Sequence, residues 1–254
     1  MRTVERRIFR VPAAAACLFL LPGAGAAHAQ DLPAASEIVA RYQKAVGGVD
    51  ALARHSVVHT TGKFLLPAAG LTADFEAWSA RPNRTVMRVL VPGFGDIRSG
   101  FDGTVAWSLN PMEGPRIMED AERLQAADEA DFDSQLRLEG SIDSMTTVGR
   151  TTLAGVECLK VRVQWKSGRE SFDCYSPETG LMVGSIAMHV SNMGSAEAIT
   201  LYDAYREFGG VVMPTRVTVQ VMGTEQVITI TDVSFDAAPD SVFELPAEIK
   251  PLVR

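Results

Sequence analysis

Hydrophobic and polar residues alternate with a period of two through most of the chain after residue 55. In the first such segment, Val58 and Phe64 fall on one side of the alternation and His59 and Lys63 on the other. This alternation is typical of strands that bury one face, and turn signals such as Asp102-Gly103 separate the segments. The pattern predicts about ten or eleven strands, most of them joined by short turns.

Two segments follow a helical spacing instead. Residues 35–54 predict a helix with Ser36 as its cap, an end at Gly47-Gly48 and a short second helical turn over 49–54. Residues 118–139 predict one or two helices with many acidic side chains, inserted over the sheet.

The fold class that follows is mainly β, with some helix (α+β). So many antiparallel strands in one sheet twist and curl, and their shared apolar face needs a cover. Only the two helical segments can supply that cover. We therefore expect a curled antiparallel sheet that forms a half-open barrel, with helices on its concave face.

Two hairpins make the predicted register explicit. A turn at Gly223-Thr224 would oppose Val219 to Ile228 and Val217 to Ile230. A turn at Ser167-Gly168 would oppose Val161 to Cys174 and Val163 to Phe172. Cys158 then points to the other face, which disfavours a Cys158–Cys174 disulfide. A one-residue shift would bring the cysteines together, but it would place Lys160 against Phe172.

The first thirty residues have the organisation of a secretory signal peptide. Four arginines precede the apolar run from Val11 to Leu21, and Ala27-His28-Ala29 is an A-x-A cleavage signature. We expect cleavage near Ala29-Gln30, a single mature domain over 31–254 in the periplasm, and no transmembrane segment after cleavage.

The net charge of the mature chain limits the kinds of molecule that it is expected to bind. The formal net charge is −7 for the full sequence, and loss of the signal would make it about −10. Such a balance argues against nucleic acid as a partner and against tight adsorption on anionic lipid.

No constellation of residues predicts an enzyme, a cofactor or a metal site. His55 and His59 straddle the expected change from helix to strand, and His189 is far from both in the sequence. A Ser-His-Asp set can assemble from distant positions, but no Gly-x-Ser-x-Gly elbow is present. Phosphate-binding glycine loops and cysteine–histidine metal motifs are absent too.

Apolar strand residues are the remaining candidates for a site. Each of them individually fits an ordinary core position. Collectively, a curled sheet of this size encloses more volume than two short helices fill, and an apolar hollow binds apolar ligands. The candidates for its lining are Phe64, Phe75, Trp78, Met87, Val89, Trp107, Val161, Val163, Phe172, Val217, Val219, Ile228 and Ile230.

Several segments resemble the LolA/LolB-like carriers of the outer membrane lipoprotein-sorting group. One is Trp78-Ser79-Ala80-Arg81-Pro82-Asn83-Arg84, and another is the Asp102-Gly103 hairpin followed by Trp107 and Asn110-Pro111. Further similar segments, in matching order, are 42–48, 175–181, 205–215 and 243–246.

This resemblance implies a half-barrel whose hydrophobic cavity holds lipid or lipoprotein acyl chains in the periplasm. It also implies a buried arginine that fastens a lid. Arg84 and Arg88 are the candidates for this contact, although their alternation can equally place them outside. A second hypothesis is a non-enzymatic sensor or scaffold of the same fold, which binds an envelope protein through a sheet edge or the acidic helices.

Overall fold

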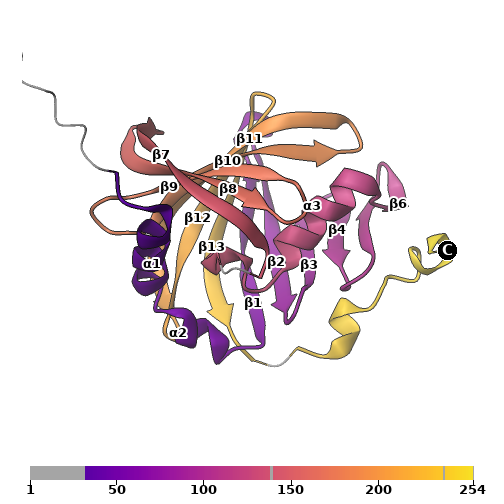
Figure 1. The fold of residues 1–254 in the computed structure, drawn as a ribbon. Coiled ribbons are helices and arrows are strands. Elements are labelled where there is room, and N and C mark those ends of the chain that lie inside the picture. The colour runs from indigo at the N-terminus through magenta and orange to yellow at the C-terminus, as the bar shows by residue number, and fades with distance from the viewer. Residues whose placement is uncertain (1–31, 138–139, 237, 254) are drawn as a thin grey trace, which may run out of the picture. The chain divides into compact units, whose positions relative to one another are not determined.

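A computed structural model describes residues 32–137, 140–236 and 238–253, and the part from Leu32 onward is one compact unit. The expected signal peptide, residues 1–30, lies outside the described residues. Thirteen strands of the described chain join in a single antiparallel sheet (Figure 1). Their bounds are β1 Val57–Leu66, β2 Leu71–Ala80, β3 Arg84–Val91, β4 Gly95–Phe101, β5 Ala106–Asn110, β6 Gly114–Ile117, β7 Ile142–Leu153, β8 Val156–Trp165, β9 Glu170–Tyr175, β10 Met182–Ser191, β11 Gly194–Phe208, β12 Val211–Val221 and β13 Thr224–Ser234.

The order of the strands explains why the sheet stays open. Strands β1 to β6 lie side by side toward one edge, and the chain then crosses to β7 at the opposite edge. From there β7 to β13 return in order, until β13 pairs with β1. The edge strands β6 and β7 do not pair, so the sheet is not closed into a barrel. The predicted fold class is confirmed, but the predicted strand count is too low. The short β6 was missed because its four residues show no alternation.

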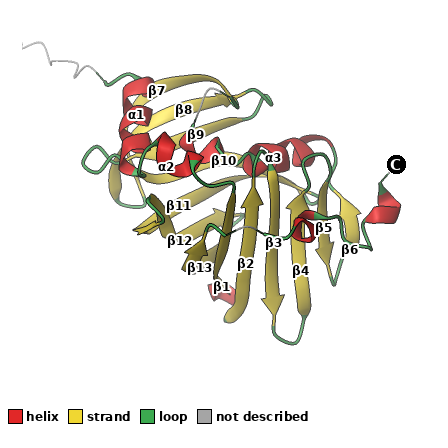
Figure 2. Ribbon diagram, turned by 90° about the horizontal axis from the view of Figure 1, so that it is seen from below, coloured by secondary structure: helices red, strands yellow, loops and turns green. Residues whose placement is uncertain are grey.

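Three α-helices occur in the described residues: α1 (Ala35–Ala45), α2 (Val49–Ala53) and α3 (Asp120–Ala130). Both helical segments were predicted. The residue at the N-cap of α1 is Ala34 rather than Ser36, and no side chain caps this helix. After α3 comes the 3-10 turn η2 (Ser134–Leu136). Figure 2 shows α1, α2 and α3 within the curve of the sheet, between its two ends.

The main core lies where α1, α2 and η2 cover the concave face. Ile38 and Leu52 from the helices pack there with Val161 and Val163 of β8, whose side chains are fully buried. A smaller cluster joins α3 to Phe101 and Ala106 of β4 and β5. Because α3 also contacts β10, this helix spans between the two halves of the sheet.

The convex face of β1 to β5 has its own cover. Trp78, Val86 and Trp107 occupy the face opposite to Phe75, and the C-terminal segment 238–253 packs on them through Phe243 and Ile249. The 3-10 turns of this segment are η3 (Asp240–Phe243) and η4 (Lys250–Leu252).

The β8–β9 hairpin corrects one predicted register. Val161 lies opposite Asp173 and Lys160 opposite Cys174, one residue away from the expected pairing. The loop has three residues, 166–168, and ends in Gly168 with φ of +88°, so the two-residue turn was wrong. A glycine in this conformation after a tight turn shifts the following strand by one position.

This shift brings the two cysteines to one face. Cys158 and Cys174 form a disulfide across β8 and β9 with their Cα atoms 5.4 Å apart, so the prediction against the disulfide was wrong. The placement of Lys160 against Phe172, which was expected to disfavour this register, is not unfavourable. The Lys160 ammonium lies 4.3 Å from the centre of the Phe172 ring. That placement is a favourable cation–π contact.

The β12–β13 hairpin keeps the predicted face with a different register. Val217 lies opposite Ile228, and Val219 lies opposite Gln226. The turn is Met222-Gly223, one residue earlier than expected, which displaces the pairing by two positions. Since the side-chain period is two, Val217, Val219, Ile228 and Ile230 still share the concave face.

Candidate functional site

A cavity of about 530 Å³ lies on the concave side of the sheet, beneath α3 and η2. We call it the hollow. One wall is apolar and is built by Met87, Val219, Val221 and Ile228 of β3, β12 and β13, all of them half-buried. This wall therefore presents hydrophobic side chains to open space inside the fold, which an ordinary core does not.

The opposite end of the hollow is polar and rests on a buried ion pair. Arg137 follows η2 and donates from Nε to Asp173 Oδ2 of β9 at 2.7 Å, and its Nη1 donates to the carbonyl of Ser134 at 2.7 Å. The Tyr175 hydroxyl donates to the same carboxylate oxygen at 3.2 Å. Arg137 also lies over the ring of Trp165, 5.1 Å from its centre.

Burial and charge together decide the protonation of this cluster. Burial raises the pKa of Tyr42 to about 12, against the opposing influence of the Arg137 charge, and it raises the pKa of Tyr175 well above its ordinary value. Burial alone would lower the pKa of Arg137, but the attraction of Asp173 raises it overall. The tyrosines therefore stay neutral and the arginine stays charged near neutral pH, opposite a carboxylate that balances it.

Helix α3 closes the third side of the hollow through side-chain hydrogen bonds. Gln125 accepts from the Val190 N–H at 2.9 Å, and its Nε2 lies 2.9 Å from Nδ1 of His189. Asp128 accepts from Arg169 at 3.1 Å and from the Ser167 hydroxyl at 2.6 Å.

Acid is expected to weaken the contact between α3 and His189. Burial lowers the pKa of His189, so the unfolded chain binds a proton more readily than the folded one. The contribution of neutral His189 to the free energy of unfolding is therefore fully present above the ordinary histidine pKa, and it is lost as the pH falls below that value. Protonation also removes the acceptor that faces the Gln125 amide.

The measurement is the free energy of unfolding at about pH 7.5 and at about pH 5, on either side of that pKa. His189→Asn should lose less stability between the two pH values than the unaltered chain. An equal loss in both proteins would contradict the assignment.

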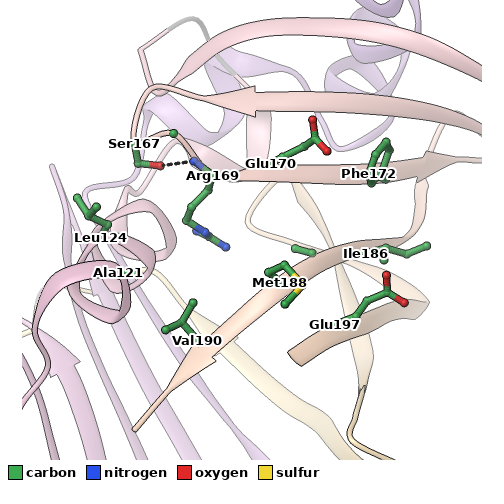
Figure 3. A pocket seen from close by; sticks show the side chains of 12 residues that line it. Ala121, Leu124, Ser167, Arg169, Glu170, Phe172, Ile186, Met188, Val190 and Glu197 are labelled. Atoms are coloured by element: carbon green, nitrogen blue, oxygen red, sulfur yellow. Dashed lines mark hydrogen bonds between the residues drawn. The ribbon is translucent and has the colours of Figure 1, made fainter. Parts of the chain in front are cut away.

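A second cavity, of about 440 Å³, lies on the outer face of β9 to β11. We call it the outer pocket. Figure 3 shows Leu124 of α3 on one side and Ile186, Met188 and Val190 of β10 on the other, with the Arg169 side chain extending between them. Glu170 and Glu197 are the carboxylates in its lining.

The predicted lining residues separate into four groups. Met87, Val219 and Ile228 border the hollow. Phe64, Phe75 and Val89 pack beside it in one cluster with Met87 and Ile228, while Val217 and Ile230 lie on the same concave face. Val161 and Val163 are fully buried in the main core. The fourth group, Trp78, Trp107 and Phe172, lies on the convex face instead of in the expected hollow.

The predicted arginines also point away from the hollow. Arg84 pairs with Asp240 at 3.3 Å and lies over the Phe243 ring, so it holds the C-terminal segment. Arg88 pairs with Asp96 at 2.9 Å on the same convex face. The segment after α3 is instead tied to the rest of the fold by Arg81, which binds Asp133, and by its own Arg137, which binds Asp173. Sequence reasoning missed Arg137 because it lies outside every strand, and only its acidic partner falls within one.

No group of three or more His, Cys, Asp or Glu side chains among the described residues is arranged to hold a metal ion. No helix in the described part of the chain is long and apolar enough to cross a membrane.

Solved structures share this fold at low sequence identity. A LolA superfamily protein from Nitrosomonas europaea matches with a TM-score of 0.55 and 14% identity, covering 84% of this chain and 99% of that one. A DUF1329 family protein from Desulfovibrio piger has a TM-score of 0.55 and 13% identity, with coverage of 82% and 96%. An outer membrane lipoprotein-sorting protein domain from Vibrio parahaemolyticus has a TM-score of 0.50 and 9% identity, with coverage of 75% and 91%.

No protein-family model and no curated protein sequence matches the chain. The agreement therefore lies in the arrangement of the strands and helices, where the resemblance found in the sequence is confirmed. The chain has the fold of the LolA superfamily and of the lipoprotein-sorting domains.

Proposed function

We propose that this protein binds a lipid or lipoprotein acyl chain in the hollow and carries it through the periplasm, without catalysing a reaction. The observation that carries the proposal is the apolar wall of Met87, Val219, Val221 and Ile228, which borders about 530 Å³ of space. This volume falls within the roughly 300–1,000 Å³ that ligand cavities span. The remaining lining, from α3, η2 and β9 to β11, carries many polar side chains. A fold shared with lipoprotein-sorting domains is consistent with this function but does not by itself establish it.

The two ends of the hollow suit the two ends of an amphipathic ligand. Burial of an acyl chain contributes about 0.8 kcal/mol per methylene, so the apolar wall can retain a chain without specific contacts. Arg137 and Asp173 at the polar end balance each other's charge. A polar head group placed there would meet hydrogen-bonding side chains without a strong net charge.

Filling the hollow should weaken the binding of an acyl chain. Val219→Trp adds an indole at the apolar wall, and we expect the affinity for a fluorescent fatty acid to fall at least about tenfold. Val148→Trp is the matched control, because Val148 is 52% exposed on edge strand β7 and lines neither cavity. Fluorescence titration measures both variants, and native mass spectrometry of gently purified protein detects any lipid retained from the host.

The proposal fails if the unaltered chain neither retains lipid nor binds the probe. Equal affinity of the unaltered chain and Val219→Trp would place the acyl chain elsewhere. A stable protein partner, crosslinked in cells that show no bound lipid, would favour a sensor or scaffold instead.

A further inference from the structure

Strand pairing between β9 and β10 ends before β10 does. Ser171 and Ala187 form the last pair, yet β10 continues to Ser191. Over these final residues α3 takes the place of a neighbouring strand, with Gln125 accepting the Val190 N–H at 2.9 Å. The wall of the protein is therefore closed here by side chains, and we call this boundary the seam.

Polar side chains hold the seam together. Arg169, the residue before β9, reaches Asp128 of α3 at 3.1 Å and lies 3.8 Å from Glu129. Ser167 in the preceding turn donates to Asp128 at 2.6 Å. Such contacts separate more easily than a ladder of backbone hydrogen bonds, since they are few and each of them involves few atoms.

The hollow and the outer pocket meet at this seam. Arg169, Ala187 and Met188 line both cavities. Ala187 and Met188 are consecutive on β10, so their side chains point to opposite faces of the sheet. The two cavities therefore lie on either side of one strand, at the position where its pairing with β9 ends.

From this juxtaposition, and resting on the proposed function, we propose that the ligand has at least two acyl chains. One chain lies in the hollow, and a second crosses the seam beside Met188 into the outer pocket. The apolar surface for this second chain is formed by Leu124 on the α3 side and by Phe172, Ile186 and Val190 on the strand side, and the Arg169 side chain extends between the two. Leu124 is 37% exposed and Met188 is 51% exposed. These apolar side chains are therefore available to contact an apolar ligand.

The test compares dipalmitoyl phosphatidylethanolamine with its one-chain lyso form. Leu124→Glu places a charge in the outer pocket and none in the hollow, because Leu124 lines only the former. We expect the two-chain lipid to bind this variant at least about tenfold more weakly, while the affinity for the lyso form changes less than about twofold. Leu252→Glu is the control with the same substitution, at a residue that is 42% exposed and lines neither pocket.

Ala121→Trp provides an independent measurement if Leu124→Glu destabilises α3. Ala121 is exposed and lines the outer pocket, so an indole there fills its volume without adding charge. The same selective loss of the two-chain lipid is expected.

Equal losses for both lipids, or no loss for either, would overturn the two-chain proposal and leave the proposed function standing. If the unaltered chain binds neither lipid, the proposed function itself fails.

Discussion

Asp173→Ala is expected to lower the free energy of unfolding by about 3–5 kcal/mol, because it leaves the charge of Arg137 buried without a partner. The Asp173 side chain is fully buried, and that of Arg137 is 10% exposed. Removing the carboxylate also takes the acceptor from the Tyr175 hydroxyl. Chemical denaturation followed by circular dichroism measures the loss, which appears as a lower midpoint at an unchanged slope.

Two further variants separate the buried charge from the rest of the interaction. Arg137→Met combined with Asp173→Leu replaces both partners by apolar groups, and we expect it to cost much less than Asp173→Ala. Asp74→Ala breaks an exposed pair with Lys63 on the outer part of β1 and β2, which should cost less than about 1 kcal/mol. If Asp173→Ala were as mild as Asp74→Ala, the buried pair could not be holding η2 against β9.

Loss of the Cys158–Cys174 disulfide is expected to cost about 3 kcal/mol. The bond closes a loop with a sequence separation of 16 residues, and a loop of this length accounts for such a contribution through the entropy of the unfolded chain. Both sulfur atoms are almost completely buried on the convex face, beside Leu153 and Ile199.

Comparing the oxidised with the chemically reduced chain isolates the cross-link, because both forms keep the same atoms in that cluster apart from two hydrogens. Using the chain from Gln30 onward leaves Cys158 and Cys174 as its cysteines, because Cys17 belongs to the expected signal peptide. Cys158→Ala combined with Cys174→Ala should lose somewhat more than reduction does, since it also removes buried volume. Identical unfolding midpoints for the oxidised and reduced chains would mean that the bond contributes nothing to stability.

Local patterns in the sequence were sufficient to predict the class of fold. Alternation identified the strands, the break at 118–139 identified the helix over the sheet, and Gly47-Gly48 marked the end of the first helix. The resemblance to lipoprotein carriers in ordered short segments agreed with the fold that the structure shows. These features depend on residues that are close together in the sequence, so they can be recognised without a structure.

The same patterns could not determine the register of paired strands to within one residue. The β8–β9 turn has three residues instead of two, which turned Phe172 to the convex face and joined the two cysteines. Whether Phe172 could line the hollow depended on the length of this turn. Whether Trp78 and Trp107 faced the hollow or the C-terminal segment was equally open, because both faces of β2 and β5 carry apolar residues.

Composition and alternation by themselves thus determined that a curled, mainly β sheet forms with helices over one face. Tertiary structure decided where space remains, which charges are buried, and that Arg137 meets Asp173 across 36 residues of sequence. The physical reason is that alternation places side chains on one of two faces, whereas a cavity or a buried ion pair arises only when distant faces are brought together.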